Sequence, residues 1–311
     1  MFFRRETARV LPDGELANVA PYHVCTEGQE DCVIFRDEED LRVAFNMIPI
    51  CACRANVIIL AAIVLNSHIH SALLAKTEDD ARRFINGFKI SVSKVLSAKY
   101  GAGEPLHLFR RIDSRPIPLL DRWHIRNALC YVYKNALDVG EKVDQYRWSS
   151  YRTMFSKRCY QEDVKPVSEL KCREIRALFK IDRMPPGTNW MMTPDCVIEP
   201  ASYCDLDYAE GAFDNDLGFF MKIMGLVDCQ QMEQELAVNP NRMRTVGELI
   251  NTMEDLSRSI YGKPLRSLTY SQKIPVIKKV WHTNRTSVAQ LARCIGLTKK
   301  EILFALGKKE E

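Results

Sequence analysis

The chain has 311 residues, of which 46% are hydrophobic and 27% are charged, and its formal net charge is +4. This length and composition predict a globular protein with a sizeable core, and they exclude a low-complexity chain. No apolar run approaches the roughly 20 residues that a membrane-spanning helix needs. The eleven cysteines are scattered and lack the spacing of a structural zinc site, which predicts reduced thiols in a cytoplasmic protein.

Hydrophobic periodicity predicts alternating strands and helices in the first half of the chain. Thr77 is expected to cap a helix, with Asp80 near the capping-box position. Strands are expected over residues 19–26, 32–35, 57–65, 68–75 and 106–112, and helices over residues 37–48, 77–100 and 119–137. Because the helices are few, the pattern predicts an α+β fold with one antiparallel sheet and helices on one face, followed by a mostly α-helical C-terminal region.

Charge divides the rest of the chain. Residues 195–255 carry a net charge of −10, and residues 258–311 carry a net charge of +9. A basic segment of this kind predicts a polyanionic partner such as nucleic acid, although an ordinary solvated surface is the simpler alternative. We expect an N-terminal arm (1–18), a folded domain (19–155), a linker (156–195), an acidic and partly helical region (196–257) and a basic helical region (258–311).

Two histidines stand at the start of the strand expected over residues 68–75. Alternate residues of a strand share one face, so the imidazoles of His68 and His70 would point the same way. Two neutral nitrogen ligands side by side suit a divalent metal ion. A structural histidine pair remains the alternative for these residues alone. His23 is expected to be structural rather than a neighbour of the site, and His124 shows no partner pattern.

Tyr131 and Asn135 lie four residues apart in the helix expected over residues 119–137, so they share one face. Tyr133 lies about 200° around the helix from Tyr131 and cannot easily share that face. A tyrosine and an amide on a helix, together with two histidines on a strand, indicate phosphodiester chemistry with Tyr131 as the nucleophile. Taken alone, a tyrosine such as Tyr131 is more often a half-buried packing residue.

Residues 19–151 resemble the single-tyrosine HUH transposases, specifically the REP-associated tyrosine transposase group. Two positions depart from the family: Ser67 stands where the family has Asn, and Ala136 stands where it has Pro. Neither departure removes a reacting group. The segments that carry the resemblance follow the family order and are residues 21–24, 34–41, 64–70, 111–115, 131–136 and 146–151.

The resemblance implies a ferredoxin-like antiparallel sheet and an enzyme that cuts and rejoins single-stranded DNA at hairpin or repeat ends. It implies that Mg²⁺ or Mn²⁺ is held by His68, His70 and Asn135. It also implies that Tyr131 attacks phosphorus, which yields a 5′-phosphotyrosine link and a free 3′-hydroxyl. One alternative is a non-catalytic DNA-binding regulator, and another is a metal-dependent RNA or nucleotide hydrolase. Both a monomer and a homodimer remain open.

Basic side chains are expected to contact the DNA backbone from the helix over residues 77–100 and from the segment before residue 119. An ordinary solvated surface is the alternative for each of them. The residues concerned are Arg82, Lys89, Arg111 and Arg115.

Residues 286–306 have the spacing of a helix-turn-helix. Gly296 is expected to make the turn, and Thr298 is expected to cap a second helix. That helix would enter the major groove of duplex DNA, with Thr298, Lys299 and Lys300 as DNA-binding residues. A packed helical hairpin without DNA contact is the alternative.

Overall fold

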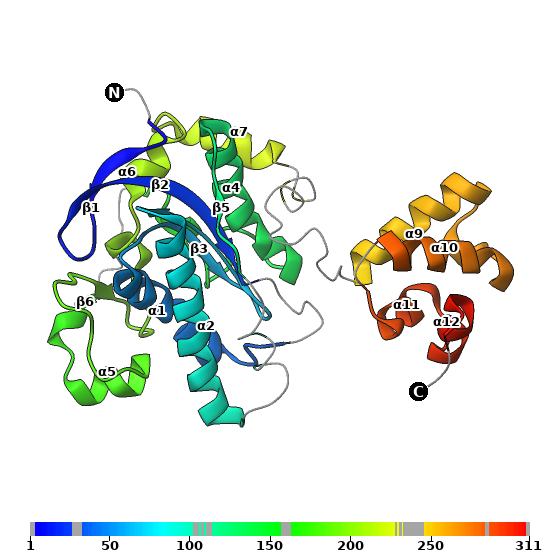
Figure 1. The fold of residues 1–311 in the computed structure, drawn as a ribbon. Coiled ribbons are helices and arrows are strands. Elements are labelled where there is room, and N and C mark those ends of the chain that lie inside the picture. The colour runs from blue at the N-terminus through cyan, green and yellow to red at the C-terminus, as the bar shows by residue number, and fades with distance from the viewer. Residues whose placement is uncertain are drawn as a thin grey trace. The chain divides into compact units, whose positions relative to one another are not determined.

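The chain forms two compact units, Met1–Val238 and Asn239–Glu311, each with its own hydrophobic core (Figure 1). The computed structural model describes residues 4–26, 33–101, 106, 109, 114–156, 163–227, 229, 232, 246–283 and 286–308.

An antiparallel sheet forms the centre of the first unit. Its strand order is β1–β2–β4–β3, and β5 also pairs with β2. The register of β2 and β4 places Cys25 opposite His70 and His23 opposite Ala72. The strands are β1 (Thr7–Val10), β2 (Leu16–Cys25), β3 (Ile58–Val64), β4 (Ile69–Ala75) and β5 (Ile117–Pro118). The first residues of the chain were expected to be an arm, and β1 instead joins the sheet.

Helices α1 (Glu38–Ala55) and α2 (Glu78–Tyr100) pack side by side and against the sheet (Figure 1). The capping box of Thr77 and Asp80 at the start of α2 confirms the prediction. Helix α1 was expected to end at residue 48, before Pro49, but it continues to Ala55. A proline inside a helix costs about 3 kcal/mol. Burial of the apolar residues after Pro49, including Ile50 at 0% exposure, offsets that cost.

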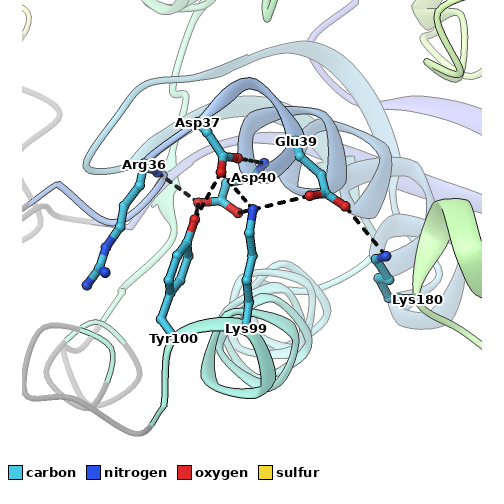
Figure 2. A network of polar contacts seen from close by, with 7 residues as sticks. All are labelled: Arg36, Asp37, Glu39, Asp40, Lys99, Tyr100 and Lys180. Carbon is cyan, nitrogen blue, oxygen red and sulfur yellow. Dashed lines mark hydrogen bonds and ion pairs between the residues drawn. The ribbon is translucent and has the colours of Figure 1, made fainter.

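A polar network joins the start of α1 to the end of α2, as Figure 2 shows. The Lys99 ammonium lies 2.8 Å from the carboxylates of both Asp37 and Asp40, and the Tyr100 hydroxyl donates to Asp40 at 2.9 Å. Hydrogen bonds from Lys99 and from the Asp40 backbone lower the pKa of Asp37 to about 2. The network fixes the position of α1 relative to α2.

Helix α4 (Arg122–Lys134) packs against β3 and β4 and continues as the 3₁₀ turn η1 (Asn135–Val139). It begins later than expected because Asp121 acts as its N-cap, accepting a hydrogen bond from the His124 backbone at 2.8 Å. The ring of Tyr131 contacts the ring of His70 on β4. Helix α4 therefore covers the sheet face to which His70 points. It packs separately from the pair formed by α1 and α2.

Two expected strands do not match the structure. Residues 33–35 form no strand, and position 32 lies outside the described residues. Leu106 and Phe109 are the described positions of the strand expected over residues 106–112, and both are helical and buried. A short apolar run is compatible with a buried helix as well as with a buried strand, so periodicity could not distinguish the two.

The segment expected to be a linker packs into the first unit. Trp190 and Met192 of this segment lie in the hydrophobic core of the first unit. Phe213 and Phe220, from the acidic stretch that follows, lie in the same core. Asn46 of α1 donates to the Cys196 carbonyl at 2.8 Å and accepts from the Ile198 backbone at 2.7 Å. The elements here are β6 (Lys165–Pro166), η3 (Val167–Glu169), α5 (Cys172–Phe179), β7 (Met191–Met192), η4 (Pro200–Ser202), α6 (Leu206–Gly211) and α7 (Leu217–Leu226), with η2 (Ser150–Thr153) before them.

The boundary between the two folded units therefore differs from the domain boundaries expected from the sequence. The acidic region over residues 196–257 is divided between the two units, because its first part packs around β3 and α4 while its last part belongs to a helix of the second unit. That helix, α9, begins at Val246, and its residues Leu249 and Met253 are fully buried in the second core.

The secondary-structure elements described in the second unit are all helices. Ser287 and Thr298 cap α11 and α12, each with a capping box, and Gly296 makes the turn between them at φ +66°. The predicted turn at Gly296 and the predicted cap at Thr298 are confirmed. The elements of the unit are α9 (Val246–Tyr261), η5 (Leu265–Ser267), α10 (Tyr270–Thr283), α11 (Val288–Ile295) and α12 (Lys299–Leu306).

None of the helices in the described part of the chain is long and apolar enough to cross a bilayer. None of the cysteines that the structure describes forms a disulfide bond.

Candidate active site

Side chains from two strands and one helix of the first unit form an aromatic cluster, which we call the histidine–tyrosine cluster. It consists of His23 on β2, His68 directly before β4, His70 on β4 and Tyr131 on α4. The ring centroids of His68 and His70 lie 4.8 Å apart, and those of His70 and Tyr131 lie 5.2 Å apart. The ring of His23 lies 5.4 Å from that of His70 and 6.0 Å from that of Tyr131.

Strand pairing and side-chain alternation assemble the cluster. His23 and His70 lie on paired strands, with His70 opposite Cys25, two residues after His23. Residues two apart on a strand share a face, so the two imidazoles point to the same side of the sheet. Tyr131 approaches from α4, which packs on that side.

Both members of the predicted metal-binding pair are held at Nδ1. The Ser67 hydroxyl lies 2.8 Å from Nδ1 of His68, and Nε2 of His23 lies 3.3 Å from Nδ1 of His70. An imidazole whose hydrogen sits on a held Nδ1 carries a lone pair on Nε2, the arrangement that metal-bound histidines use. With the hydrogen on Nδ1, each of the two rings could bind a divalent cation through Nε2. His68 is half-buried and His70 is 6% exposed.

The two tyrosines of α4 lie in different surroundings. Tyr131 is 5% exposed and contacts the histidines. Tyr133 is fully buried, and its ring packs against those of Tyr151 and Phe220. These contacts place Tyr131 and Tyr133 on different faces of α4, as their spacing along the helix predicts.

Asn135 follows α4 and is 2% exposed. Its amide nitrogen donates to the carbonyl oxygen of Tyr131 at 2.7 Å, which leaves the amide oxygen Oδ1 as the atom able to bind a cation. None of the hydrogen bonds described for the chain joins Asn135 to His68 or His70. Within the described residues, no three His, Cys, Asp or Glu side chains form a metal-binding group.

The sequence pattern did not assign to the site either His23, which belongs to this cluster, or His124, which lies near His23. Burial and then the charge of His124 lower the pKa of His23 to about 3, so His23 is neutral near pH 7. His124 accepts from the Leu120 backbone through Nδ1 at 3.3 Å. One signal was available for His124, because it lies seven residues before Tyr131, two helical turns away on the same face. His23 needed knowledge of the strand pairing.

The predicted DNA contacts of the first unit are not equivalent. Lys89 is only 3% exposed, so its ammonium cannot lie on an open DNA-binding face. Its position explains the burial, because it lies four residues after the buried Ile85 and four before the buried Ser93 on α2. The guanidinium groups of Arg82 and Arg115 both form ion pairs with the carboxylate of Glu78, with nitrogen–oxygen distances of 2.8 Å and 3.7 Å. Arg111 lies outside the described residues.

The predicted contacts of the second unit lie at the start of α12. The Thr298 hydroxyl caps this helix, accepting from the Glu301 backbone at 3.3 Å and donating to the Glu301 carboxylate at 2.7 Å. Lys299 and Lys300 are exposed in the first turn. Phe304, on the same helix, is 74% exposed.

Comparison with known proteins finds no family model, no curated protein and no solved structure that matches this chain.

Proposed function

We propose that this protein is a metal-dependent endonuclease or transposase that cuts and rejoins single-stranded DNA with Tyr131 as its nucleophile. The observation that carries the proposal is the contact between the rings of Tyr131 and His70, beside the ring of His68. A hydroxyl nucleophile next to two orientable imidazoles is suited to phosphodiester transfer. We further propose a ferredoxin-like plan for the sheet, supported by the chain order β2–α1–β3–β4–α2–β5 with β2 paired to both β4 and β5.

Mg²⁺ or Mn²⁺ bound by Nε2 of His68 and His70, with Oδ1 of Asn135 as the proposed third ligand, would offset charge on the scissile phosphate. The hydrogen bond at Nδ1 of each histidine sets the orientation of its ring. The bond from Asn135 to the Tyr131 carbonyl holds the last turn of α4, and with it the position of the tyrosine.

The proposed step exchanges one phosphoester bond for another. The hydroxyl of Tyr131 loses its proton, its oxygen bonds to phosphorus, and the bond from phosphorus to the 3′ oxygen breaks. The leaving 3′ oxygen gains a proton, so the products are a 5′-phosphotyrosine and a 3′-hydroxyl. The reverse reaction on another 3′ end rejoins the strand without a nucleotide cofactor. A DNA substrate inside the cell and the lack of disulfide bonds among the described cysteines support a cytoplasmic location.

The test is formation of a covalent protein–DNA adduct. The full chain is incubated with Mn²⁺ and labelled single strands drawn from hairpins in the DNA that flanks its gene. We expect a denaturation-resistant band that is absent from Tyr131→Phe and retained by Tyr133→Phe, the matched control on the other face of α4. Replacing both His68 and His70 with Ala should remove the band and leave the circular dichroism spectrum unchanged. An adduct of undiminished intensity in Tyr131→Phe contradicts the proposal.

A second candidate is a DNA-binding regulator that acts through α11 and α12. It is favoured by the exposed Lys299 and Lys300, whereas Arg82 and Arg115 in the first unit pair with one carboxylate. A regulator would bind duplex DNA without Mg²⁺ and would form no adduct. Duplex binding that is unaffected by loss of His68 and His70, together with no adduct in the unaltered chain, would favour this candidate.

A further inference from the structure

His23 is fully buried, and its ring lies beside both the proposed metal ligand His70 and the proposed nucleophile Tyr131, with centroids 5.4 Å and 6.0 Å away. Its Nε2 faces Nδ1 of His70 at 3.3 Å. Its other ring nitrogen, Nδ1, is buried and makes no hydrogen bond to the described residues. Among the described residues, the contact with His70 is therefore the one hydrogen bond of the His23 ring.

Two neutral imidazoles share one hydrogen in such a bond, so only two arrangements exist. If His23 donates, the hydrogen of His70 sits on Nε2, and that nitrogen cannot bind a cation. If His70 donates from Nδ1, its Nε2 carries the lone pair that a metal ligand requires. The position of a single hydrogen thus decides whether His70 can act as a ligand.

We propose that His23 is a positioning residue that accepts the Nδ1 hydrogen of His70 and thereby holds His70 in the form that binds a divalent cation through Nε2. The inference rests on the metal site of the proposed function. His23 itself is not a ligand in this arrangement, because its Nε2 is directed at the ring of His70.

The affinity of the full chain for Mn²⁺, measured from the spin-resonance signal of the free ion, tests the inference. We expect His23→Phe, which keeps a planar ring and removes the acceptor, to weaken Mn²⁺ binding about 10- to 100-fold. His23→Gln places an amide oxygen near the position of Nε2 and should restore most of the affinity. Val24→Ala is the matched control, because Val24 is equally buried on β2 but points to the opposite face.

A second readout follows the hydrogen directly. In ¹⁵N spectra of histidine-labelled full chain with saturating Mg²⁺, Nδ1 of His70 should carry the hydrogen and Nε2 should not. A hydrogen on Nε2 of His70 in the unaltered chain overturns the inference, even if every variant at position 23 fails to fold.

The outcomes separate this inference from the proposed function. An adduct that forms normally, with Mn²⁺ affinity unchanged in His23→Phe, overturns the role of His23 alone. Affinity that depends on His23 without any adduct overturns the nuclease proposal and supports the role of His23. A chain that binds no Mn²⁺ overturns both.

Discussion

The amide of Asn135 and the carbonyl of Tyr131 are joined by a hydrogen bond of 2.7 Å. This bond closes the last turn of α4 and uses only the nitrogen of the amide, so the oxygen can serve a second purpose. Asn135 therefore has two separable roles, one in the stability of the helix end and one in the proposed metal site.

Substitutions at position 135 should separate these roles. Asn135→Ala loses both, so we expect a loss of about 1 kcal/mol in the free energy of unfolding and at least ~10-fold weaker Mn²⁺ binding. Asn135→Asp keeps an oxygen ligand but cannot donate to Tyr131, so stability should fall while Mn²⁺ binding is retained. Denaturant unfolding and metal titration measure the two effects. Equal Mn²⁺ affinity in Asn135→Ala and the unaltered chain excludes Asn135 as a ligand.

The exposed lysines of α12 should contribute to duplex binding through phosphate contacts. Replacing Lys299 and Lys300 with Ala should weaken binding of unrelated duplexes to a similar degree and reduce the slope of log affinity against log salt by up to about 2. A matched control replaces Lys76 and Arg83, which pair with Glu15 and Asp80 in the first unit, and removes the same charge. Equal losses in the two double variants would point to net charge as the cause.

Thr298 should stabilise α12 through its cap whether or not it contacts DNA. Thr298→Ala loses the hydroxyl that caps the Glu301 backbone, so we expect the second unit to lose about 1 kcal/mol of stability. Thr298→Ser keeps the hydroxyl and should be close to neutral. Thermal unfolding monitored at the helical signal measures both variants, and an unchanged midpoint for Thr298→Ala would show that the cap contributes little.

The network at Asp37 predicts a pH dependence of stability. The folded pKa of Asp37, about 2, lies below its ordinary value of 3.8, so the unfolded chain binds this proton more readily. The contribution of Asp37 should be fully present above about pH 4 and should disappear as the pH falls toward 2. Asp37→Asn can still cap α1 but has no charge to titrate, so its stability should fall less steeply over this interval. Identical pH profiles of the two proteins would rule out this contribution.

Local signals in the sequence identified much of the proposed site. The spacing of His68 and His70 predicted neighbouring rings, and the positions of Tyr131 and Tyr133 on α4 separated the residue that contacts the histidines from the one that packs in the core. The sequence likewise predicted that Thr77 and Thr298 cap helices α2 and α12. These features depend on geometry that repeats within one helical turn or one strand pleat, so a short stretch of chain determines them.

Tertiary packing decided the rest. His23 meets His70 only because β2 pairs with β4, a contact between residues that are 47 positions apart. Lys89 is buried, and Leu106 and Phe109 are helical, because of what packs around them rather than because of their own sequence. An apolar run or a charged side chain is compatible with several surroundings, and the free energy that selects among them comes from burial against distant parts of the chain.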